Sequence, residues 1–422
     1  MPIMNHGRAG LTLVLASLPV LACGSPGAPA ATPASSAAGP PAIAKAGSFA
    51  SDVAWLGKYG KIVVLEAPAE RGKVAVAPGW QGRVMTSAFD EAAPGLGFVH
   101  RSFIEAGKTG TPFDNYGGED RFWLGPEGGQ FGLYFPKGKP FAFAEWQTPH
   151  EMQEGAWPVT RESGSAITLA KRVTVDNWTG TRFVVDVERE ISVLSGAAVA
   201  ASLAVKPEGL AKVRIVAYQT RNRITNAGEA AWKPETGLLS IWILGMFNPA
   251  PDMHVLVPFE KEGAGEIVND RYFGKVPADR LSVRLDKGFL DFVCDGKHRS
   301  KIGLGPARAR SVLGSYSRHE KLLTLVKLAA PPRGRYVNSM WEQQKDPYGG
   351  DAINSYNDGP TEPGKPALGG FYEIESSSPA AELAKGASLE HVHATFHFTG
   401  EEPALDAIAR AVLGIALSDV AR

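Results

Sequence analysis

The densest group of chemically active side chains lies near the C-terminal end, in residues 391–398 (HVHATFHF). Successive side chains of a β-strand point to opposite faces, so a strand here places His391, His393 and His397 on one face and the apolar residues on the other. Imidazoles can ligate metals, hydrogen-bond substrates or transfer protons near neutral pH. This segment is therefore the first candidate for a functional surface.

Three roles are open for this histidine face. His391 and His393 could ligate a metal, with Glu373 or Glu375 as a third ligand. They could line a polar cleft and bind substrate or act in proton transfer. They could also lie on a solvated face of a sheet. The metal site is the least favoured because no second tight pair of ligands is evident, and we expect no metal and no cofactor.

Four polar, glycine-rich clusters interrupt the apolar patterning, at residues 115–132, 146–150, 336–359 and 371–379. Paired glycines allow tight turns, and the clusters combine carboxylate, amide or guanidinium groups with aromatic rings. A sugar requires both, because its hydroxyls bind polar groups while its apolar ring face packs on an aromatic plate. The clusters favour a polar, aromatic-lined cleft. Each could instead be a structured connecting loop with polar turn residues and packed tryptophans.

A basic segment, Lys297-His-Arg-Ser-Lys-Ile-Gly303, is followed by Arg308 and Arg310. These side chains could hold a carboxylate or another anion, or they could be charges on a solvated edge. The whole chain carries 44 basic and 44 acidic residues. This balance gives no electrostatic footprint for nucleic acid, which we exclude as a partner.

The elements that must position these residues are mostly β-strands. Short segments rich in β-branched residues, separated by turn residues, predict strands at 61–67, 73–77, 83–87, 166–175, 181–191, 212–220, 238–245, 253–258, 281–285 and 321–327. Helices are expected only at the ends, over 48–58 and 404–420. We predict an all-β fold, a large antiparallel β-supersandwich that forms a single domain over 48–422.

The N-terminal end predicts export. Residues 1–23 combine a short basic region with an apolar run, too short to span a bilayer, that ends in Leu21-Ala22-Cys23. This pattern is typical of a lipoprotein signal peptide with Cys23 as the lipid acceptor. Residues 24–47 are rich in Ala, Pro and Ser and predict a flexible tether. We therefore expect a lipid anchor in a membrane, at the periplasm or the cell surface, and an unpaired, buried Cys294.

The layout resembles the galactose mutarotase-like (aldose 1-epimerase) superfamily, over roughly residues 55–400. The segment around Gly117-Gly-Glu-Asp-Arg121 falls where that family has its sugar-binding arginine. Trp146-Gln-Thr-Pro-His150 is similar to its histidine-containing loop. Glu375, in Tyr372-Glu-Ile-Glu-Ser-Ser, falls where the family has its general base. The resemblance implies a β-supersandwich with a sugar cleft, in an uncharacterised exported branch.

One position departs from the family pattern. The family's second histidine, its proposed general acid, follows a Thr-Asn pair, whereas Thr225-Asn226 is followed here by Ala227. Anomer interconversion needs a base at the C1 hydroxyl and an acid at the ring oxygen. An orthodox mutarotase reaction would thus require a histidine from the C-terminal strand to replace the missing acid.

The leading hypothesis is a mono- or oligosaccharide-processing lipoprotein that acts at or near an anomeric centre, with Glu375 as base and His150 or His393 as acid. Epimerase, lyase and glycosidase reactions are all open, because one fold hosts many chemistries. The alternative is a glycan-binding lipoprotein without catalysis. The expected substrate-binding residues are Arg121, Trp123, Glu127, Trp341, Glu342, Asn354, Tyr356, Glu373 and His391.

Overall fold

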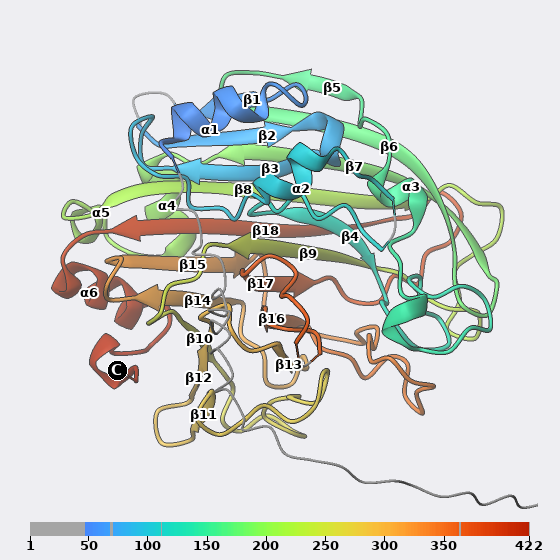
Figure 1. Cartoon of the computed structure of the whole chain (residues 1–422). Helices are drawn as coiled ribbons and strands as arrows, with labels where there is room; N and C mark the ends of the chain where they lie inside the picture. Colours follow the sequence, from blue (N-terminus) through green and yellow to red (C-terminus); the bar gives the residue numbers. More distant parts are fainter. Residues whose placement is uncertain (1–46, 68–70, 111, 363, 422) are drawn as a thin grey trace, which may run out of the picture. The chain divides into compact units, whose positions relative to one another are not determined.

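The computed structural model describes residues 47–67, 71–110, 112–362 and 364–421 (Figure 1). These residues belong to one compact unit, Lys45–Arg422. The predicted signal peptide, the acceptor Cys23 and the predicted tether up to residue 46 lie outside the described residues. Within the described ranges, no helix combines the length and the apolar character needed to cross a membrane.

The larger of the sheets has ten antiparallel strands, and its long central strands run side by side in Figure 1. In spatial order these strands are β11 (Leu281–Arg284), β12 (Phe289–Val293), β10 (His254–Pro258), β14 (Val312–Ser317), β15 (Leu322–Leu328), β18 (Ser388–Thr399), β8 (Arg214–Asn226), β7 (Arg182–Val193), β6 (Ala166–Asp176) and β5 (Val159–Glu162). The polar/apolar alternation of β6 and β7 and the predicted turn between them are both confirmed.

A five-stranded antiparallel sheet carries the candidate site. Its order is β13 (Ser300–Leu304), β16 (Ile353–Asn357), β17 (Tyr372–Ser377), β9 (Ser240–Phe247) and β4 (Arg121–Gly125). A three-stranded sheet is formed by β1 (Val63–Glu66), β2 (Lys73–Ala77) and β3 (Arg83–Ala88). A backbone bridge between Val84 and Asp120 joins it to the start of β4. The predicted large antiparallel β-sandwich is confirmed.

The five-stranded sheet packs on the ten-stranded sheet through side chains of β17 and β18. Tyr372 and Ile374 lie in the core between the sheets, and the Tyr372 hydroxyl contacts Ser315 Oγ at 2.7 Å. On the other face of β18, Phe396 and Phe398 pack among the apolar side chains of the C-terminal helix. The histidines of β18 consequently point inward, between two sheets.

Helices were expected only at the two ends of the chain, but the described residues include four further short helices between the strands. The helices are α1 (Phe49–Leu56), α2 (Arg101–Ala106), α3 (His150–Gln153), α4 (Gly196–Leu203), α5 (Pro207–Leu210) and α6 (Glu402–Val412). The helix predicted over 404–420 is shorter than expected, because the chain leaves the helical conformation at Gly414, where φ is +73°. A short 3-10 turn follows at Leu417–Asp419.

Cys294 is a free thiol with no exposed surface, as predicted. It lies just after β12, and burial raises the pKa of its thiol far above the ordinary value of 9.0. The thiol is therefore a packing group rather than a nucleophile.

Candidate functional site

Cross-strand pairing collects polar side chains on the outer face of the five-stranded sheet. One row runs from Arg121 through Leu244 and Glu375 to Asn354. Because opposed residues of antiparallel strands lie on the same face, this row places an arginine and a glutamate on one side of the sheet. The adjacent row brings Glu373, Tyr356 and Lys301 together on that same side.

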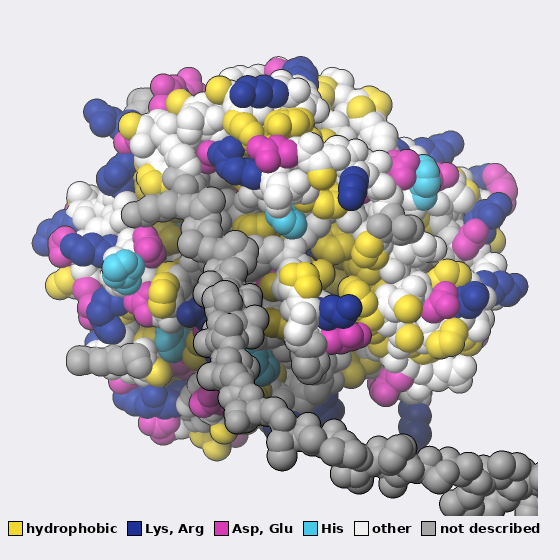
Figure 2. Space-filling view, viewed as in Figure 1, with side chains coloured by type: hydrophobic (Ala, Val, Ile, Leu, Met, Phe, Trp, Pro, Cys, Tyr) yellow, Lys and Arg dark blue, Asp and Glu magenta, His cyan; other side chains and the backbone are white. Residues whose placement is uncertain are grey.

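Loops surround this face and form a pocket. Its empty volume, including the open mouth, is about 560 Å³. The lining combines aromatic rings with charged groups. It consists of Phe113, Arg121, Trp123, Glu127, Phe143, Trp146, Trp242, Leu244, Phe273, Arg299, Lys301, Trp341, Tyr356, Leu368, Phe371 and Glu373. On the face viewed in Figure 2, hydrophobic side chains gather in the middle and charges of both signs are scattered around them. The pocket therefore presents aromatic plates beside a small set of polar groups.

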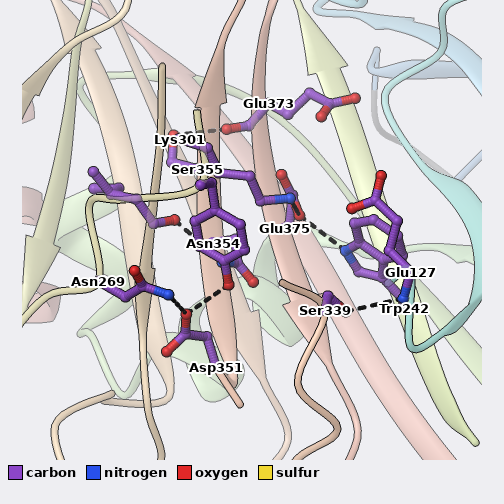
Figure 3. A network of polar contacts seen from close by, with 12 residues as sticks. Glu127, Trp242, Asn269, Lys301, Ser339, Asp351, Asn354, Ser355, Glu373 and Glu375 are labelled. Carbon is purple, nitrogen blue, oxygen red and sulfur yellow. Dashed lines mark hydrogen bonds and ion pairs between the residues drawn. The ribbon is translucent and has the colours of Figure 1, made fainter. Parts of the chain in front are cut away.

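Glu375 and Lys301 form a buried ion pair at the floor of the pocket (Figure 3). Lys301 Nζ lies 2.8 Å from Glu375 Oε2, and the indole nitrogen of Trp242 donates to the same oxygen at 2.9 Å. The side chains of Glu375 and Lys301 are 0% and 6% exposed. The second oxygen of Glu375, Oε1, is buried and has no hydrogen-bond partner.

Arg121 and Glu373 form a second buried pair, with Arg121 Nη2 donating to Glu373 Oε1 at 3.0 Å. The guanidinium also stacks on Trp123, its carbon 4.0 Å from the ring centroid. Two further nitrogens of Arg121, Nε and Nη1, are buried without a partner, as is the indole nitrogen of Trp123. A buried donor without an acceptor costs about 1–3 kcal/mol. A ligand with several acceptor oxygens would relieve this cost.

Glu127 supplies a third carboxylate to the pocket. It lies in the loop after β4, where the Ser339 hydroxyl holds its backbone N–H at 3.1 Å. Its Oε1 accepts a hydrogen bond of 2.8 Å from the indole nitrogen of Trp146, itself a lining residue. The two loops thereby fix both the carboxylate and one aromatic wall.

Burial dominates the electrostatics of these groups. It raises the pKa of Glu127 and of Glu373 above the ordinary value of 4.5, and the charges of Lys301 and Arg121 only partly oppose this effect. For Lys301, burial lowers the pKa, but the carboxylates of Glu375 and Glu127 outweigh it, so the net pKa is raised. The pocket thus holds carboxyl groups that keep their protons to higher pH beside a firmly charged ammonium group.

Six of the predicted substrate-binding residues line this pocket together: Arg121, Trp123, Glu127, Trp341, Tyr356 and Glu373. The predicted base Glu375 lies immediately beneath, in contact with the lining residues Lys301 and Trp242. The sequence motifs therefore identified a group of side chains that the fold brings to one place.

Two other predicted binding residues do not line the pocket. The amide nitrogen of Asn354 donates hydrogen bonds to the Tyr272 hydroxyl (3.1 Å) and to the carbonyl of Ile302 (3.2 Å). Figure 3 shows it in a network with Asn269 and Asp351 below the Glu375–Lys301 pair. Glu342 is exposed to solvent. Asn354 thus supports the floor, and Glu342 lies outside the lining.

His150, predicted as a general acid, begins α3 with a side chain that is 75% exposed. Its Nε2 lies 2.9 Å from Glu154 Oε2, one helical turn further on. It is absent from the pocket lining. A donor in this place does not reach the Glu375 carboxylate.

His391 and His393 face away from the pocket, and this corrects the prediction of a catalytic or substrate-binding role. Both contact Ser376 Oγ at 2.8 Å, and the side chain of Ser376 lies on the opposite face of β17 from those of Glu373 and Glu375. Burial lowers the pKa of His391 to about 3 and that of His393 to about 4. These imidazoles are neutral groups packed between the sheets.

None of the three roles considered for the histidine strand describes it. His397 bridges Thr324 Oγ1 at 2.8 Å and Glu119 Oε2 at 3.1 Å inside the fold. The shared face of β18 is thus neither a cleft wall nor a solvated surface. In the part of the chain that the structure describes, no group of three or more His, Cys, Asp or Glu side chains is arranged to hold a metal ion.

Several lining residues were missed by the sequence motifs. Trp242 and Leu244 come from β9, an apolar strand whose alternate positions face the pocket. Arg299 and Lys301 come from the basic segment that was interpreted as an anion site or a solvated edge. The sequence of β9 is almost entirely apolar and gives no sign of which side chains face the pocket. The inward course of Lys301 depends on which strand pairs with β13.

Ala227, which follows Thr225-Asn226, lies beyond the end of β8 and donates its backbone N–H to Val184 at 2.9 Å. It does not line the pocket. The lining residue that stands opposite the carboxylates is Lys301, whose ammonium group pairs with Glu375.

The chain belongs to a family described as a family of unknown function, DUF6786, whose model matches residues 47–422. No curated protein matches the chain. Among solved structures, a putative aldose 1-epimerase from Escherichia coli K12 is similar at 11% identity and a TM-score of 0.46, over 80% of this chain and 98% of that one. A galactose mutarotase-like protein from Lactobacillus casei is similar at 12% identity and a TM-score of 0.46, over 80% of this chain and 100% of that one. These proteins carry the names of the superfamily that the sequence motifs resemble.

Proposed function

We propose that this protein binds a saccharide in the aromatic pocket and catalyses proton transfer at or near the anomeric carbon of that sugar. One observation carries the proposal. The pocket holds buried carboxyl groups and buried, unpartnered polar atoms directly beside aromatic rings. An apolar ligand would leave Arg121 Nη1 and the indole nitrogen of Trp123 without partners, whereas the hydroxyl oxygens of a polyol can accept from both.

The acid and base roles follow from the different surroundings of two glutamates on β17. Glu375 is paired with the Lys301 ammonium and keeps one free oxygen, Oε1, so it is the proton acceptor. Glu373 has a pKa raised by burial, so it is the proton donor. Paired carboxyl groups in contrasting environments are a general solution for acid/base chemistry at one pH. This assignment replaces the histidine acid expected from the sequence.

The proposed step is balanced within the sugar. Glu375 takes the proton of the C1 hydroxyl while Glu373 gives a proton to the ring oxygen, and the bond between C1 and the ring oxygen breaks to leave an open-chain aldehyde. Rotation about the bond between C1 and C2, followed by the reverse transfers, closes the ring in the other anomeric form. Arg121, which pairs with Glu373, has free donors to hold a hydroxyl.

The test measures sugar binding by calorimetry and anomer interconversion by NMR exchange spectroscopy on a panel of hexoses, pentoses and their oligomers. We expect Glu375→Gln and Glu373→Gln each to lower the exchange rate about 10²–10⁴-fold and to change the dissociation constant only a few-fold. Glu382→Gln, an exposed glutamate paired with Arg335, is the matched control. An unmodified protein that binds a sugar without accelerating exchange would instead be the glycan-binding protein of the alternative hypothesis. If no sugar binds, the proposal is wrong.

We further propose that the protein is exported and lipid-anchored through Cys23. The pattern in residues 1–23 supports this, since the apolar run ends at a cysteine that follows small and aliphatic residues. Expression of the full chain with labelled palmitate should label the protein and send it to the membrane fraction. Cys23→Ser should abolish both outcomes, while Cys294→Ser should leave both unchanged. Labelling that persists in Cys23→Ser would contradict the anchor.

A further inference from the structure

Arg299 is a positively charged lining residue without a counter-charge. It lies one residue before β13, is only half-buried, and its guanidinium carbon is 3.7 Å from the ring centroid of Phe273 and 5.7 Å from that of Phe143. Among the described residues it forms no ion pair, and its buried Nε has no hydrogen-bond partner. Stacking on an aromatic face fixes the plane of the guanidinium and leaves its edge for a ligand.

Asp358, which acts on Tyr356 together with Arg299, has other hydrogen-bond partners. Asp358 accepts hydrogen bonds from the Tyr356 hydroxyl at 3.0 Å and from the backbone N–H groups of Gly369 and Gly370 at 2.9 and 2.8 Å. The charge of Arg299 acts on the Tyr356 hydroxyl, which is a neutral partner. No carboxylate of the described residues therefore forms an ion pair with Arg299 at the pocket wall.

The other cations of the lining have their own ion-pair partners. Arg121 pairs with Glu373 and Lys301 pairs with Glu375, whereas Arg299 forms no such pair among the described residues. The lining itself carries the two carboxyl groups of Glu127 and Glu373. Burial raises the pKa of both carboxyl groups, which reduces their negative charge. A pocket of this kind attracts an anion rather than a neutral molecule.

We propose that the saccharide carries a carboxylate, as in a uronic acid, and that Arg299 binds this carboxylate while the ring lies against the aromatic lining. The inference rests on the proposed function, because it assigns the sugar class for the same pocket. A planar carboxylate matches the parallel N–H groups of a guanidinium. Arg299 then sets the specificity, and the Arg121–Glu373 and Lys301–Glu375 pairs act at the other end of the sugar.

The experiment compares matched sugars by calorimetry: glucuronate, galacturonate and mannuronate, the corresponding neutral hexoses, and the corresponding 6-phosphates. We expect at least one uronate to bind about tenfold or more tightly than its neutral hexose, as one charge-assisted contact provides. Arg299→Gln should weaken binding of the uronate about tenfold more than binding of the neutral hexose, so that the preference is lost. Because the side chain is half-exposed, this substitution should not unfold the protein.

Arg310→Gln is the matched control, since Arg310 is exposed, pairs with Glu260 and does not line the pocket. A neutral hexose that binds as tightly as its uronate overturns the carboxylate proposal but leaves the proposed function intact. A 6-phosphate that binds more tightly than the uronate also overturns it, by assigning the site to a phosphate. An Arg299→Gln variant that loses both sugars equally contradicts the specificity role. If no sugar of any series binds, the proposed function fails together with this inference.

Discussion

Two buried arginines, Arg189 and Arg121, sit in opposite situations although they are 0% and 2% exposed. Arg189 lies on β7 and donates from Nε to the carbonyl of Gly82 at 3.0 Å and from Nη1 to Asn222 Oδ1 at 2.7 Å. Its Nη2 donates to the carbonyl of Asp120 at 3.2 Å and pairs with the carboxylate of the same residue. Arg121 lies on β4 and, among the described residues, makes a single hydrogen bond, to Glu373.

The difference separates a structural cluster from a binding site. Arg189 joins β7 to the start of β4 with each of its three nitrogens bonded, as buried polar groups in a stable core normally are. Arg121 leaves two buried nitrogens open toward a pocket. Buried polar groups that lack hydrogen-bond partners are expected at functional sites. The two arginines should therefore respond in opposite ways to the same substitution.

The largest effect is expected for Arg189→Met, which leaves the Asp120 carboxylate buried without its partner. Removing one member of a buried ion pair costs about 3–5 kcal/mol, and we expect the free energy of unfolding to fall by this amount. Urea unfolding followed by tryptophan fluorescence measures it. Arg121→Met is the matched comparison and should cost clearly less, because Glu373 can take up a proton. Equal losses in the two variants would contradict the distinction between the two arginines.

The histidines between the sheets predict a loss of stability in acid. The unfolded chain protonates His391 and His393 near pH 6.5, whereas in the folded chain burial lowers their pKa to about 3 and about 4. Unfolding therefore takes up protons as the pH falls from about 6.5 to 4, and each pKa unit corresponds to about 1.4 kcal/mol. We expect the free energy of unfolding to fall by about 2–3 kcal/mol per histidine over this range. His393→Asn should flatten this part of the curve, while exposed His150→Asn should leave it unchanged.

The third prediction concerns sugar binding, for which Arg121 should matter more than Arg189, the reverse of their effects on stability. Arg121→Met removes donors that face the ligand, so affinity for the sugar should fall about tenfold or more, as for the loss of a charge-assisted hydrogen bond. Calorimetry at a temperature well below unfolding measures this loss. Lys171→Met is the control, because Lys171 is also partly buried and bonds to backbone carbonyls, but lies outside the pocket. Undiminished affinity in Arg121→Met would remove this arginine from the site.

The fold was predictable where strands alternate and less so where they are polar. Strands such as β6 and β7 have long polar/apolar repeats, and the sequence located them. Three strands of the pocket sheet, β4, β16 and β17, lie inside the glycine-rich polar clusters. The last two carry asparagine, serine and glutamate among their apolar side chains. Pairing with neighbouring strands overrides the weak β-propensity of these residues. The polar side chains that serve the site thus interrupt the polar/apolar alternation by which a strand is predicted.

The site was predictable as a set of residues but not as a geometry. The clusters were selected because carboxylates and guanidinium groups beside aromatic residues are unusual in plain loops. They contain Arg121, Glu127, Glu373 and Glu375. The alternation in β18 was also read correctly, yet it could not tell which face turns inward. Only the packing of β17 on β18 shows that Ser376 meets the histidines while Glu375 points the other way. The residues within each strand do not show which other strand it packs against.

Glu373→Gln should change the pH dependence of stability with the opposite sign to that of the histidines. Burial raises the folded-state pKa of Glu373 above 4.5, so the folded chain holds this proton more tightly than the unfolded chain. Its contribution is fully present below about pH 4.5 and is lost as the pH rises through the folded-state pKa. Because glutamine does not titrate, the variant should gain stability relative to the unmodified protein as the pH rises from 4.5 to 8, by about 1.4 kcal/mol for each unit by which the pKa is raised.

Urea unfolding of both proteins across this pH range measures the gain as a difference, which cancels the contribution of the histidines. Glu382→Gln, at an exposed site, should show no such gain. If Glu373→Gln follows the unmodified protein at every pH, the carboxyl group of Glu373 titrates normally and cannot be the proton donor. If it gains stability as expected, the folded chain binds the proton of Glu373 more tightly than the unfolded chain does, as the proton-donor role requires.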